Sequence, residues 1–293
     1  MKKKSYYGYF FVAPYFIIFL IFSLYPILNS FVLSLSHWDG LGESVYVGFD
    51  NYARLLSNPY FYQSILNTFI IWIISIVPEL IIALVLAMIL NEKFIKGRHL
   101  FQAVFYFPNI VTPITIGVLA SLLFDWQTGS VNKFLMGLGI IDDPVNWFAH
   151  PFIAQVIVAT VMCWQWFGFN MLIYMAGLQS IPRTLYDAAE IDGANKFQVA
   201  TKIVIPLLKP VVMFTVITSI IGGMQIFEVP LVTGTGSGDS TQTMMVYLYE
   251  AAFKRFQYGY ASSVSYGIFI IILALSFISF KFSKKRQKAP TGL

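Results

Sequence analysis

Six long apolar runs constrain this 293-residue chain more than any other feature of its sequence. The runs are approximately 10–33, 65–90, 100–124, 152–178, 207–232 and 261–280. A bilayer core about 30 Å thick is crossed by roughly 20 apolar residues in a helix, so each run is long enough to span it. Charged residues make up only 11% of the chain, against roughly 25% in an ordinary soluble domain. The sequence therefore predicts an all-α membrane protein with six transmembrane helices.

The basic residues predict how these helices are oriented. With the N-terminus in the cytoplasm, fifteen of the 19 Lys and Arg residues fall on the cytoplasmic side, with three in 2–4, three in 93–98, four in 183–209 and five in 281–288. The other four are Arg54, Lys133, Lys254 and Arg255. Since cytoplasmic connections are enriched in Lys and Arg, we expect both termini in the cytoplasm. This distribution explains the net charge of +5 without a nucleic-acid partner.

These assignments divide the chain into three parts. Residues 1–9 are expected to form a cytoplasmic N-terminus, residues 10–281 the transmembrane domain and residues 282–293 a basic cytoplasmic tail. Lys2 to Lys4 precede the first run, as in a secretory signal, but the run is too long and lacks a small-residue cleavage site. We therefore expect it to remain as the first transmembrane helix.

The sequence offers no residue grouping typical of an enzyme or a metal site. Cys163 is the single cysteine, and the three histidines lack the spacing of metal ligands. The stretch GTGSGDSTQT, which begins at Gly234, lacks the lysine of a nucleotide-binding loop, so we expect a flexible outer turn. No nucleophile and base lie close together in sequence. We expect no catalysis, no cofactor and no metal.

The connection between the first two runs contains a further helical pattern. Phe49, Tyr52, Leu55 and Leu56 recur at helical spacing. Asp50 is of the residue type preferred at a helix N-cap. This predicts an amphipathic helix at the outer surface with Asp50 as its cap.

Two carboxylates lie within the apolar runs, each close to a proline. Glu79 follows Pro78, and Glu228 lies two residues before Pro230. A proline inside a helix frees a backbone carbonyl and kinks the helix, so both positions could border a polar cavity. Ionisable groups in membranes are costly and are often functional. For Glu79, a functional role and a hydrogen-bonded packing role both remain open.

Aromatic and amide side chains in the fourth and fifth runs are typical of a pathway for an uncharged, polyhydroxylated solute. Flat rings can stack on the C–H faces of a sugar, while amides and carboxylates bind its hydroxyl groups. The candidate pathway residues are Trp164, Phe167, Asn170, Gln225, Phe227 and Glu228. For each ring the alternative is packing or contact with lipid. A carboxylate at Glu228 favours a neutral or amine-bearing saccharide, because like charges repel.

A polar segment between the fourth and fifth runs has the pattern of a helix-turn-helix. Ser180 is a candidate cap, and Pro182 suits the first helical turn. Gly193 can end this helix, and a second one begins near Asn195. Alanines on the first helix would let another protein approach its backbone closely. We expect segment 180–206 to lie on the cytoplasmic surface and to contact a partner there.

This segment resembles a signature of the membrane subunits of binding-protein-dependent ABC importers. That signature, the EAA motif, is Glu-Ala-Ala, three residues, Gly, nine residues and Ile-x-Leu-Pro. The chain matches it at identical spacing through Asp187, Ala188, Ala189, Gly193, Ile203 and Pro206. It departs by Asp187 in place of Glu and Ile205 in place of Leu. The stretches FDNYARLLSNPYF, KGRHLFQAVFYFPNIV and QIFEVPLVTG are similar to landmarks of carbohydrate-uptake permeases, which include maltose-type and glycerol-3-phosphate-type systems.

The resemblance implies a permease subunit in the cell membrane of a bacterium or archaeon. A second homologous permease would complete the translocation pathway, two copies of a cytoplasmic ABC ATPase would hydrolyse ATP, and an extracytoplasmic solute-binding protein would deliver a sugar. The residues expected to couple to the ATPase are Asp187, Ala188, Ala189, Asp192, Gly193, Ile203 and Pro206. Closure of the ATPase pair would then move the spans between inward-open and outward-open states.

Two other classes of membrane protein fit the sequence less well. An ATP-independent secondary transporter or channel should carry ion-coupling groups or a repeated polar motif in the membrane, whereas this chain has two isolated carboxylates. A membrane-embedded enzyme or a purely structural subunit would leave the EAA-like motif unexplained. Co-purification with an ATPase subunit discriminates among the three classes.

Overall fold

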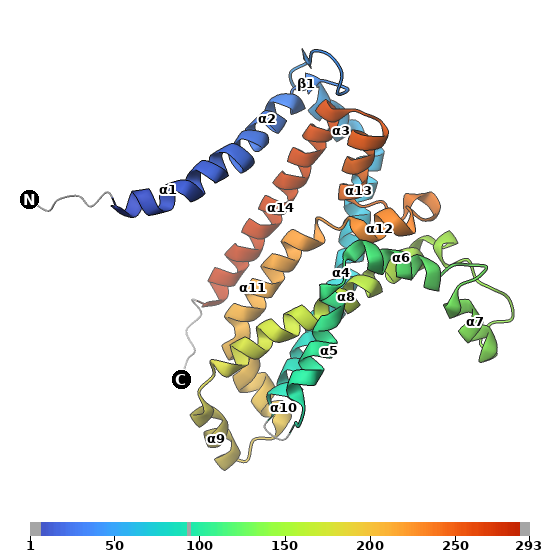
Figure 1. The fold of residues 1–293 in the computed structure, drawn as a ribbon. Coiled ribbons are helices and arrows are strands. Elements are labelled where there is room, and N and C mark those ends of the chain that lie inside the picture. Colours follow the sequence, from blue (N-terminus) through green and yellow to red (C-terminus); the bar gives the residue numbers. More distant parts are fainter. Residues whose placement is uncertain (1–6, 93–94, 288–293) are drawn as a thin grey trace, which may run out of the picture. The chain divides into compact units, whose positions relative to one another are not determined.

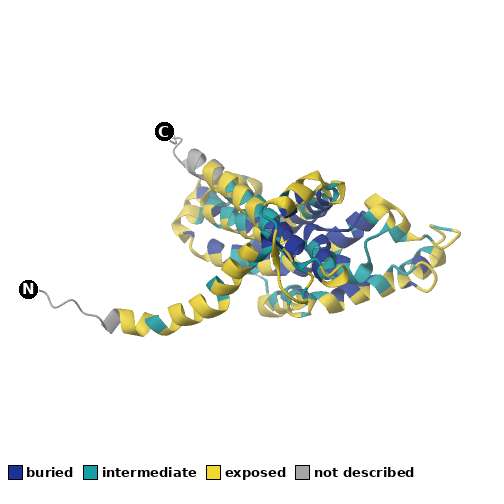
Figure 2. Cartoon of the chain, turned by 90° about the horizontal axis from the view of Figure 1, so that it is seen from above, coloured by how far each residue is buried: buried dark blue, intermediate teal, exposed yellow. Residues whose placement is uncertain are grey.

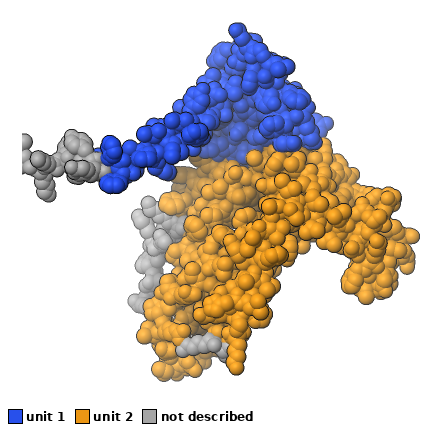
Figure 3. Space-filling model, in the orientation of Figure 1, with its two compact units in different colours: residues 1–61, 247–271 blue, residues 62–246, 272–293 orange. Residues whose placement is uncertain are grey.

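The computed structural model describes residues 7–92 and 95–287, with side chains for residues 9–92 and 95–281. The predicted lysine-rich start at residues 2–4 and the predicted tail beyond residue 287 lie outside the described residues. The described part is mostly helical (Figure 1). It divides into two compact units (Figure 3), which comprise residues 1–61 with 247–271 and residues 62–246 with 272–293.

The first unit contains the N-terminal helices and the turn that precedes the last helix. Its elements are α1 (Tyr7–Phe19), the π-helical turn η1 (Leu20–Leu24), α2 (Tyr25–Ser34), β1 (Ser36–His37), β2 (Val45–Tyr46), α3 (Asp50–Ser57), the end of α13 (Met244–Tyr249), the π-helical turn η5 (Glu250–Lys254) and the first part of α14 (Tyr258–Gln287). The two short strands pair antiparallel, with Ser36 opposite Tyr46. Helices α1 and α2 form one apolar stretch that is exposed along most of its length (Figure 2). An apolar surface of this size requires cover by lipid or protein.

Helix α3 forms where the sequence predicts a helix, but its cap and its buried face differ. Phe49 is the N-cap, and Asp50 is already the first helical residue, with no side-chain cap hydrogen bond. The buried residues are Asn51 and Leu55, whereas Phe49 and Leu56 are exposed. The Asn51 amide donates to the backbone oxygens of Ser34 at 3.0 Å and Ser36 at 2.9 Å. A buried amide bonded to the end of α2 and to β1 therefore anchors this helix, and the prediction of Asp50 as its cap is wrong.

The second unit contains the helices between these two regions. Its elements are the rest of α4 (Pro59–Asn91), α5 (Arg98–Ile110), α6 (Pro113–Leu123), α7 (Ser130–Gly137), the 3-10 turn η2 (Trp147–Ala149), α8 (Pro151–Gln179), α9 (Arg183–Ile191), α10 (Lys196–Val199), the π-helical turn η3 (Ala200–Val204), α11 (Ile205–Gly223), α12 (Glu228–Thr233), the 3-10 turn η4 (Ser237–Asp239), the start of α13 and the end of α14.

Five helical stretches of the described residues are long and apolar enough to cross a membrane. They are Tyr9–Ser34, Pro59–Asn91, Pro151–Gln179, Lys196–Thr233 and Tyr258–Lys281. Each overlaps one of the predicted runs. The third run is different, because α5 and α6 meet at an angle of 88°. The total is therefore five spans, or six if the bent pair is one broken span.

The bend in the third run has a local cause. Thr112 has an extended backbone and caps α6, with its hydroxyl accepting from the backbone N–H of Thr115. Pro113 follows as the first residue of α6 and has no N–H to continue the ladder of α5. The prediction of one continuous helix over 100–124 is therefore wrong.

The two prolines near carboxylates behave differently. Helix α4 runs through Pro78 without ending. The fifth run, by contrast, breaks after Gly223 and resumes at Glu228, with Phe227 as the N-cap and Pro230 in the first turn of α12. Of the two, only Pro230 lies at an interruption of the helix. This position suits proline, because the first turn of a helix tolerates it.

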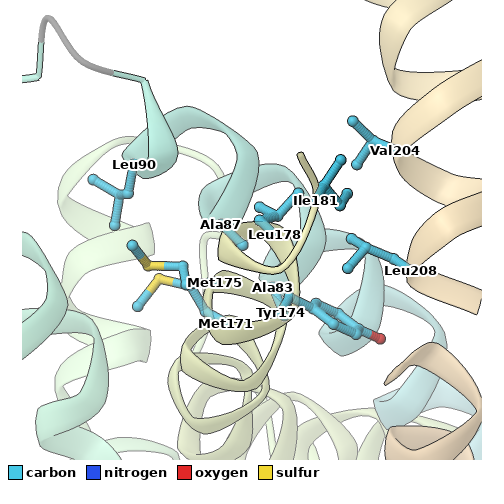
Figure 4. Packing of buried hydrophobic residues seen from close by; sticks show 10 residues of the cluster. All are labelled: Ala83, Ala87, Leu90, Met171, Tyr174, Met175, Leu178, Ile181, Val204 and Leu208. Carbon is cyan, nitrogen blue, oxygen red and sulfur yellow. The ribbon is translucent and has the colours of Figure 1, made fainter. Parts of the chain in front are cut away.

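The core of the second unit lies where α4, α8 and α11 meet. Figure 4 shows the side chains that fill it, namely Ala83, Ala87, Leu90, Met171, Tyr174, Met175, Leu178, Ile181, Val204 and Leu208. Glycines on α8 allow the close approach of its neighbours. A Cβ on Gly168 would overlap the backbone carbonyl of Phe105 in α5, and a Cβ on Gly177 would lie 2.8 Å from a methyl group of Leu208. Helix α8 is thus held against both α5 and α11.

Candidate functional site

The helix-turn-helix expected at 180–206 is present, although it begins later than predicted. Helix α9 starts at Arg183, and its N-cap is Pro182, with no side-chain cap hydrogen bond. Ser180 is instead the C-cap of α8, where its hydroxyl donates to the backbone oxygen of Gly177 at 2.7 Å. The prediction of Ser180 as the cap of the new helix is wrong, because its backbone continues the α8 conformation.

The turn between α9 and α10 is closed by the backbone itself. Gly193 has φ +70°, in the left-handed region that favours glycine. Its N–H donates to the oxygen of Glu190, and the N–H of Ala194 donates to the oxygen of Ala189 at 2.9 Å. These two bonds form the Schellman arrangement, which satisfies carbonyl groups at the end of a helix. The predicted stop at Gly193 is confirmed.

The second helix begins after Asn195, as its sequence predicts, and the structure adds a full capping box there. The Asn195 side chain accepts from the N–H of Gln198 at 2.9 Å, and the Gln198 side chain accepts from the N–H of Asn195 at 2.8 Å. The chain then passes through η3 into α11 without a break. Ile203 is half-buried in η3, and Pro206 lies in the first turn of α11. The segment is therefore joined directly to a long apolar helix.

Exposure separates the candidate coupling residues into two groups. Asp187, Ala188, Asp192 and Gly193 are exposed. Ala189 is buried, at 6% exposure. The small side chain of Ala189 thus serves packing within this chain, whereas Ala188 can meet a partner.

Two large apolar residues beside the turn were not predicted from the sequence as partner-contact residues. Ile191 is 86% exposed and Phe197 is 76% exposed. They flank the turn at Gly193 from the end of α9 and the start of α10. Large apolar side chains this exposed next to a helix-turn-helix are typical of contact with another protein. The sequence signal that could have identified them is an apolar residue on each side of a predicted polar turn.

A pocket of about 920 Å³ lies between the helix-turn-helix and the ends of α4 and α8. Its walls include Glu92, Tyr186 and Lys196. The Lys196 ammonium lies 3.4 Å from a carboxylate oxygen of Glu92, so an ion pair joins α10 to the end of α4. Burial raises the pKa of Tyr186, whose enclosed hydroxyl has no hydrogen-bond partner among the described residues.

The segment is also tied to the core by apolar contacts. Ile181, before α9, and Val204, at the end of η3, both belong to the cluster shown in Figure 4. Figure 1 places α9 and α10 at the same end of the second unit as the C-terminal end of α8. A displacement of the helix-turn-helix would therefore act on α8 and α11 through packed side chains.

The candidate pathway residues lie in two groups. Three are on α8, where Trp164 is exposed, Phe167 packs edge-on against Phe105 and Asn170 is buried. The Asn170 amide donates to a carboxylate oxygen of Glu79 on α4, and both residues are buried. Glu79 thus has the hydrogen-bonded packing contact that the sequence left open.

The other three pathway candidates lie at the break between α11 and α12. The Gln225 amide donates to the backbone oxygen of Ile221 at 2.9 Å. Phe227 and Glu228 are half-buried at the start of α12. Irregular backbone within an apolar run is tolerated where protein buries it or a cavity solvates it.

Comparison with known proteins identifies the family of this helical arrangement. The family described as "Binding-protein-dependent transport system inner membrane component" matches residues 52–284. The chain belongs to this family. It is therefore a multi-pass membrane protein and the permease subunit of an ABC importer, a transport component and not an enzyme.

Several curated permeases are similar over nearly their whole length. The lactose transport system permease protein LacF of Rhizobium radiobacter is 37% identical over 97% of this chain and 97% of its own. The arabinooligosaccharides transport system permease protein AraP of Bacillus subtilis is 35% identical, covering 94% of this chain and 88% of its own. The trehalose/maltose transport system permease protein MalF of Thermococcus litoralis is 32% identical, covering 96% and 94%.

A solved structure shows the same fold. One chain of a bacterial ABC transporter involved in the import of the acidic polysaccharide alginate matches with a TM-score of 0.83 over 98% of this permease and 97% of that chain. The sequence identity is 23%. A chain of a bacterial alginate ABC transporter, solved in complex with a periplasmic protein bound to alginate pentasaccharide, also matches with a TM-score of 0.83.

The stretch that was expected to be a flexible turn is instead tightly bound within the permease. We call residues 234–243 the glycine loop. The Asn67 amide donates to the backbone oxygens of Asp239 at 2.8 Å and Gln242 at 3.1 Å. Gln155 donates to Asn67 Oδ1 at 3.1 Å and to the oxygen of Ser240 at 2.9 Å.

The end of the glycine loop is also buried. The four residues 240–243 are all buried, and Met244 donates its N–H to the hydroxyl of Thr68 at 2.9 Å. The prediction of a flexible turn is wrong because amides from α4 and α8, far away in sequence, satisfy the carbonyl groups of the loop. The only hint in the sequence was the presence of Asn67 and Gln155 within apolar runs.

Proposed function

We propose that this permease forms the translocation pathway of an ABC sugar importer together with a second homologous permease. Two copies of a cytoplasmic ATPase drive it, and an extracytoplasmic solute-binding protein delivers the sugar. The observation that carries the proposal is the helix-turn-helix, which presents Ala188, Ile191 and Phe197 to a partner while Ala189 and Val204 pack inward.

The proposed topology has six spans and both termini in the cytoplasm. The bent pair α5 and α6 serves as the third span, and residues 10–281 form the membrane domain, with 282–293 as its basic tail. The concentration of Lys and Arg in alternate connections supports this orientation. The host membrane is that of a bacterium or archaeon, the sources of the curated relatives described above.

We propose a neutral saccharide as the substrate. The relatives are named for lactose, arabinooligosaccharides and trehalose/maltose. Trp164, Phe167, Gln225, Phe227 and Glu228 are the residues proposed to line the pathway, since rings and hydrogen-bonding groups together suit a sugar. Asn170 contributes indirectly, by holding Glu79.

The proposed mechanism is mechanical. Closure of the ATPase pair pushes the exposed residues Asp187, Ala188, Asp192 and Gly193. Ala189, Ile203 and Pro206 keep the segment joined to its neighbours, so α8 and α11 move with it. The spans then rock between inward-open and outward-open states, because packed interfaces are bistable and not continuously deformable.

The experiment that tests this function is reconstitution of the complete complex with Ala188→Trp. A bulky ring at this exposed position should block close approach of the ATPase and abolish stimulated ATP hydrolysis and sugar uptake. Ala188→Ser is the matched control, because it keeps the side chain small, and it should behave as wild type. Normal stimulated hydrolysis by Ala188→Trp, or a wild-type preparation that transports without an ATPase, would contradict the proposal.

A further inference from the structure

A cluster of cations in the first unit remains unexplained by ATPase coupling or by the pathway. Three of the four basic residues assigned to the outer side are in this unit, namely Arg54 on α3, Lys254 at the end of η5, and Arg255. The fourth, Lys133, is on α7 in the second unit. Arg54 and Arg255 are exposed, so their charges face whatever adjoins this surface.

Two tyrosine rings hold the two guanidinium groups. The Arg54 guanidinium lies 4.3 Å from the centre of the Tyr260 ring, and the Arg255 guanidinium lies 5.3 Å from the centre of the Tyr247 ring. Arg54 also donates to Gln257 Oε1 at 2.9 Å. A cation stacked on an aromatic face is favoured electrostatically, so both groups are fixed before any partner arrives.

The rings themselves are immobilised by one another. The centres of Tyr247 and Tyr260 are 6.5 Å apart, and their hydroxyl groups form a hydrogen bond of 2.7 Å. The Asn58 amide donates to the Tyr247 hydroxyl at 2.9 Å. Burial raises the pKa of Tyr247 well above its usual range, so this hydroxyl stays neutral. The result is a rigid support of two adjacent rings, each of which carries one guanidinium group.

The two guanidinium groups have no carboxylate partner among the described residues, whereas Lys254 is paired with Glu250 at 2.8 Å. A guanidinium group binds a carboxylate through two parallel hydrogen bonds. A preorganised guanidinium loses less conformational entropy when it does so. The chemistry that complements this surface is therefore a pair of carboxylates.

Two exposed aromatic residues lie in the same turn of the chain as Arg255. Phe253 is 56% exposed and Phe256 is 57% exposed. Phe256 has φ +53°, a left-handed backbone that a bulky residue seldom adopts. The turn around it is closed by the N–H of Arg255 bonding to the oxygen of Glu250 and the N–H of Gln257 bonding to that of Ala251. Strained residues that surrounding structure holds in place gather at functional surfaces.

We propose that Arg54 and Arg255, with Phe253 and Phe256 beside them, form a docking surface for acidic side chains on the solute-binding protein. This inference rests on the proposed function and on its topology, which puts this surface outside the cell. The family to which the chain belongs is binding-protein-dependent. Arginine and aromatic residues are enriched in protein interfaces, and a cluster of both fits a protein surface better than a free sugar acid.

The test is the concentration of solute-binding protein that gives half-maximal stimulation of ATP hydrolysis by the full complex in lipid nanodiscs. Arg54→Gln and Arg255→Gln should each raise it about tenfold, since a lost charge pair at an interface acts on affinity. The rate at saturating binding protein should stay unchanged. Lys133→Gln is the matched control and should leave the half-maximal concentration unaltered. Added salt should weaken the wild type more than the double variant, because screening acts only on charges that remain.

Three results would overturn the proposal that this surface docks the solute-binding protein. One is a half-maximal concentration in the double variant equal to that of Lys133→Gln. Another is loss of stimulation at saturation without a change in half-maximal concentration. The third is binding of a soluble uronic-acid oligosaccharide, used as the probe, that the double variant abolishes while docking stays normal. Failure of the proposed function is distinguishable, because the wild-type complex would then show no stimulation at all. If Arg54→Gln reduces the yield of the complex, Arg255→Gln decides alone, since its guanidinium group lacks the bond to Gln257.

Discussion

Two polar segments flank the fifth apolar run, and they use their polar groups in opposite ways. The helix-turn-helix of residues 183–204 satisfies its backbone locally, through the Schellman turn at Gly193 and the capping box at Asn195. The glycine loop of residues 234–243 depends on amides from two other helices, Asn67 on α4 and Gln155 on α8. Most side chains of the first segment are at least partly exposed, whereas residues 240–243 of the second are buried. A locally closed segment can be displaced as a body, whereas the glycine loop holds helices together.

This difference predicts that substitutions in the two segments will separate stability from activity. Stability should fall most in the glycine loop, and coupling should fall most in the helix-turn-helix. Thermal unfolding of the purified complex measures the first, and stimulated ATP hydrolysis measures the second.

The largest expected loss of stability follows from Asn67→Ala. This change removes the donor for one buried and one part-buried carbonyl group and the acceptor for Gln155, and each unpaired buried group carries a desolvation cost. We expect the free energy of unfolding to fall by about 2–4 kcal/mol. Gln63→Ala is the matched control, because Gln63 makes one exposed bond to the oxygen of Gly238, and it should cost less than about 1 kcal/mol. Equal effects would show that the loop is not held by its buried amides.

A smaller difference should separate two glycines that both have a positive φ. Gly236 has φ +66°, and a Cβ there would lie 2.7 Å from Ser240 Oγ. Gly193 has φ +70°, and a Cβ there would meet nothing within 4 Å. Gly236→Ala should therefore cost about 2 kcal/mol, from backbone strain and crowding together, while Gly193→Ala should cost about 1 kcal/mol, from strain alone. A larger unfolding shift for Gly193→Ala would reverse the comparison.

The contrast also explains what the sequence could predict. The helix-turn-helix is recoverable because its signals are local: Gly193 needs a left-handed backbone, and Asn195 and Gln198 are three residues apart. The long helices are recoverable because length and apolarity alone specify a membrane span. The bend before Pro113 could also have been predicted, since Thr112 and Pro113 form a cap and a first helical residue.

The remaining features depend on contacts between distant residues. Nothing near GTGSGDSTQT shows that Asn67 and Gln155 will bind its carbonyl groups. Asn51, and not Asp50, anchors α3, because its amide bonds to carbonyl groups at the end of α2 and in β1. The pairing of Glu79 with Asn170 likewise joins helices about ninety residues apart. Sequence patterns identify helices well, but they do not show which isolated polar side chains meet.

A modest effect is expected at the capping box. Asn195→Ala removes the acceptor for the N–H of Gln198 and should lower stability by about 1 kcal/mol. Asn195→Ser retains a capping oxygen and should restore most of it. Because the box orders the start of α10, the alanine variant should also reduce stimulated ATP hydrolysis at saturating binding protein. An alanine variant that loses stability but keeps full stimulation would show that the cap has no part in coupling.

The smallest change in stability should accompany the largest change in activity. Ile191 and Phe197 are mostly exposed, so Ile191→Ser with Phe197→Ser should alter the free energy of unfolding by less than about 0.5 kcal/mol. If they contact the ATPase, the rate of stimulated ATP hydrolysis should fall at least about tenfold in the same double variant, since apolar anchors carry much of the binding energy at interfaces. Ile140→Ser, at another exposed apolar position, is the control and should leave both measurements unchanged. An unfolding shift as large as that of Asn67→Ala would mean that Ile191 and Phe197 stabilise this chain and do not serve a partner, and the distinction between the two polar segments would fail.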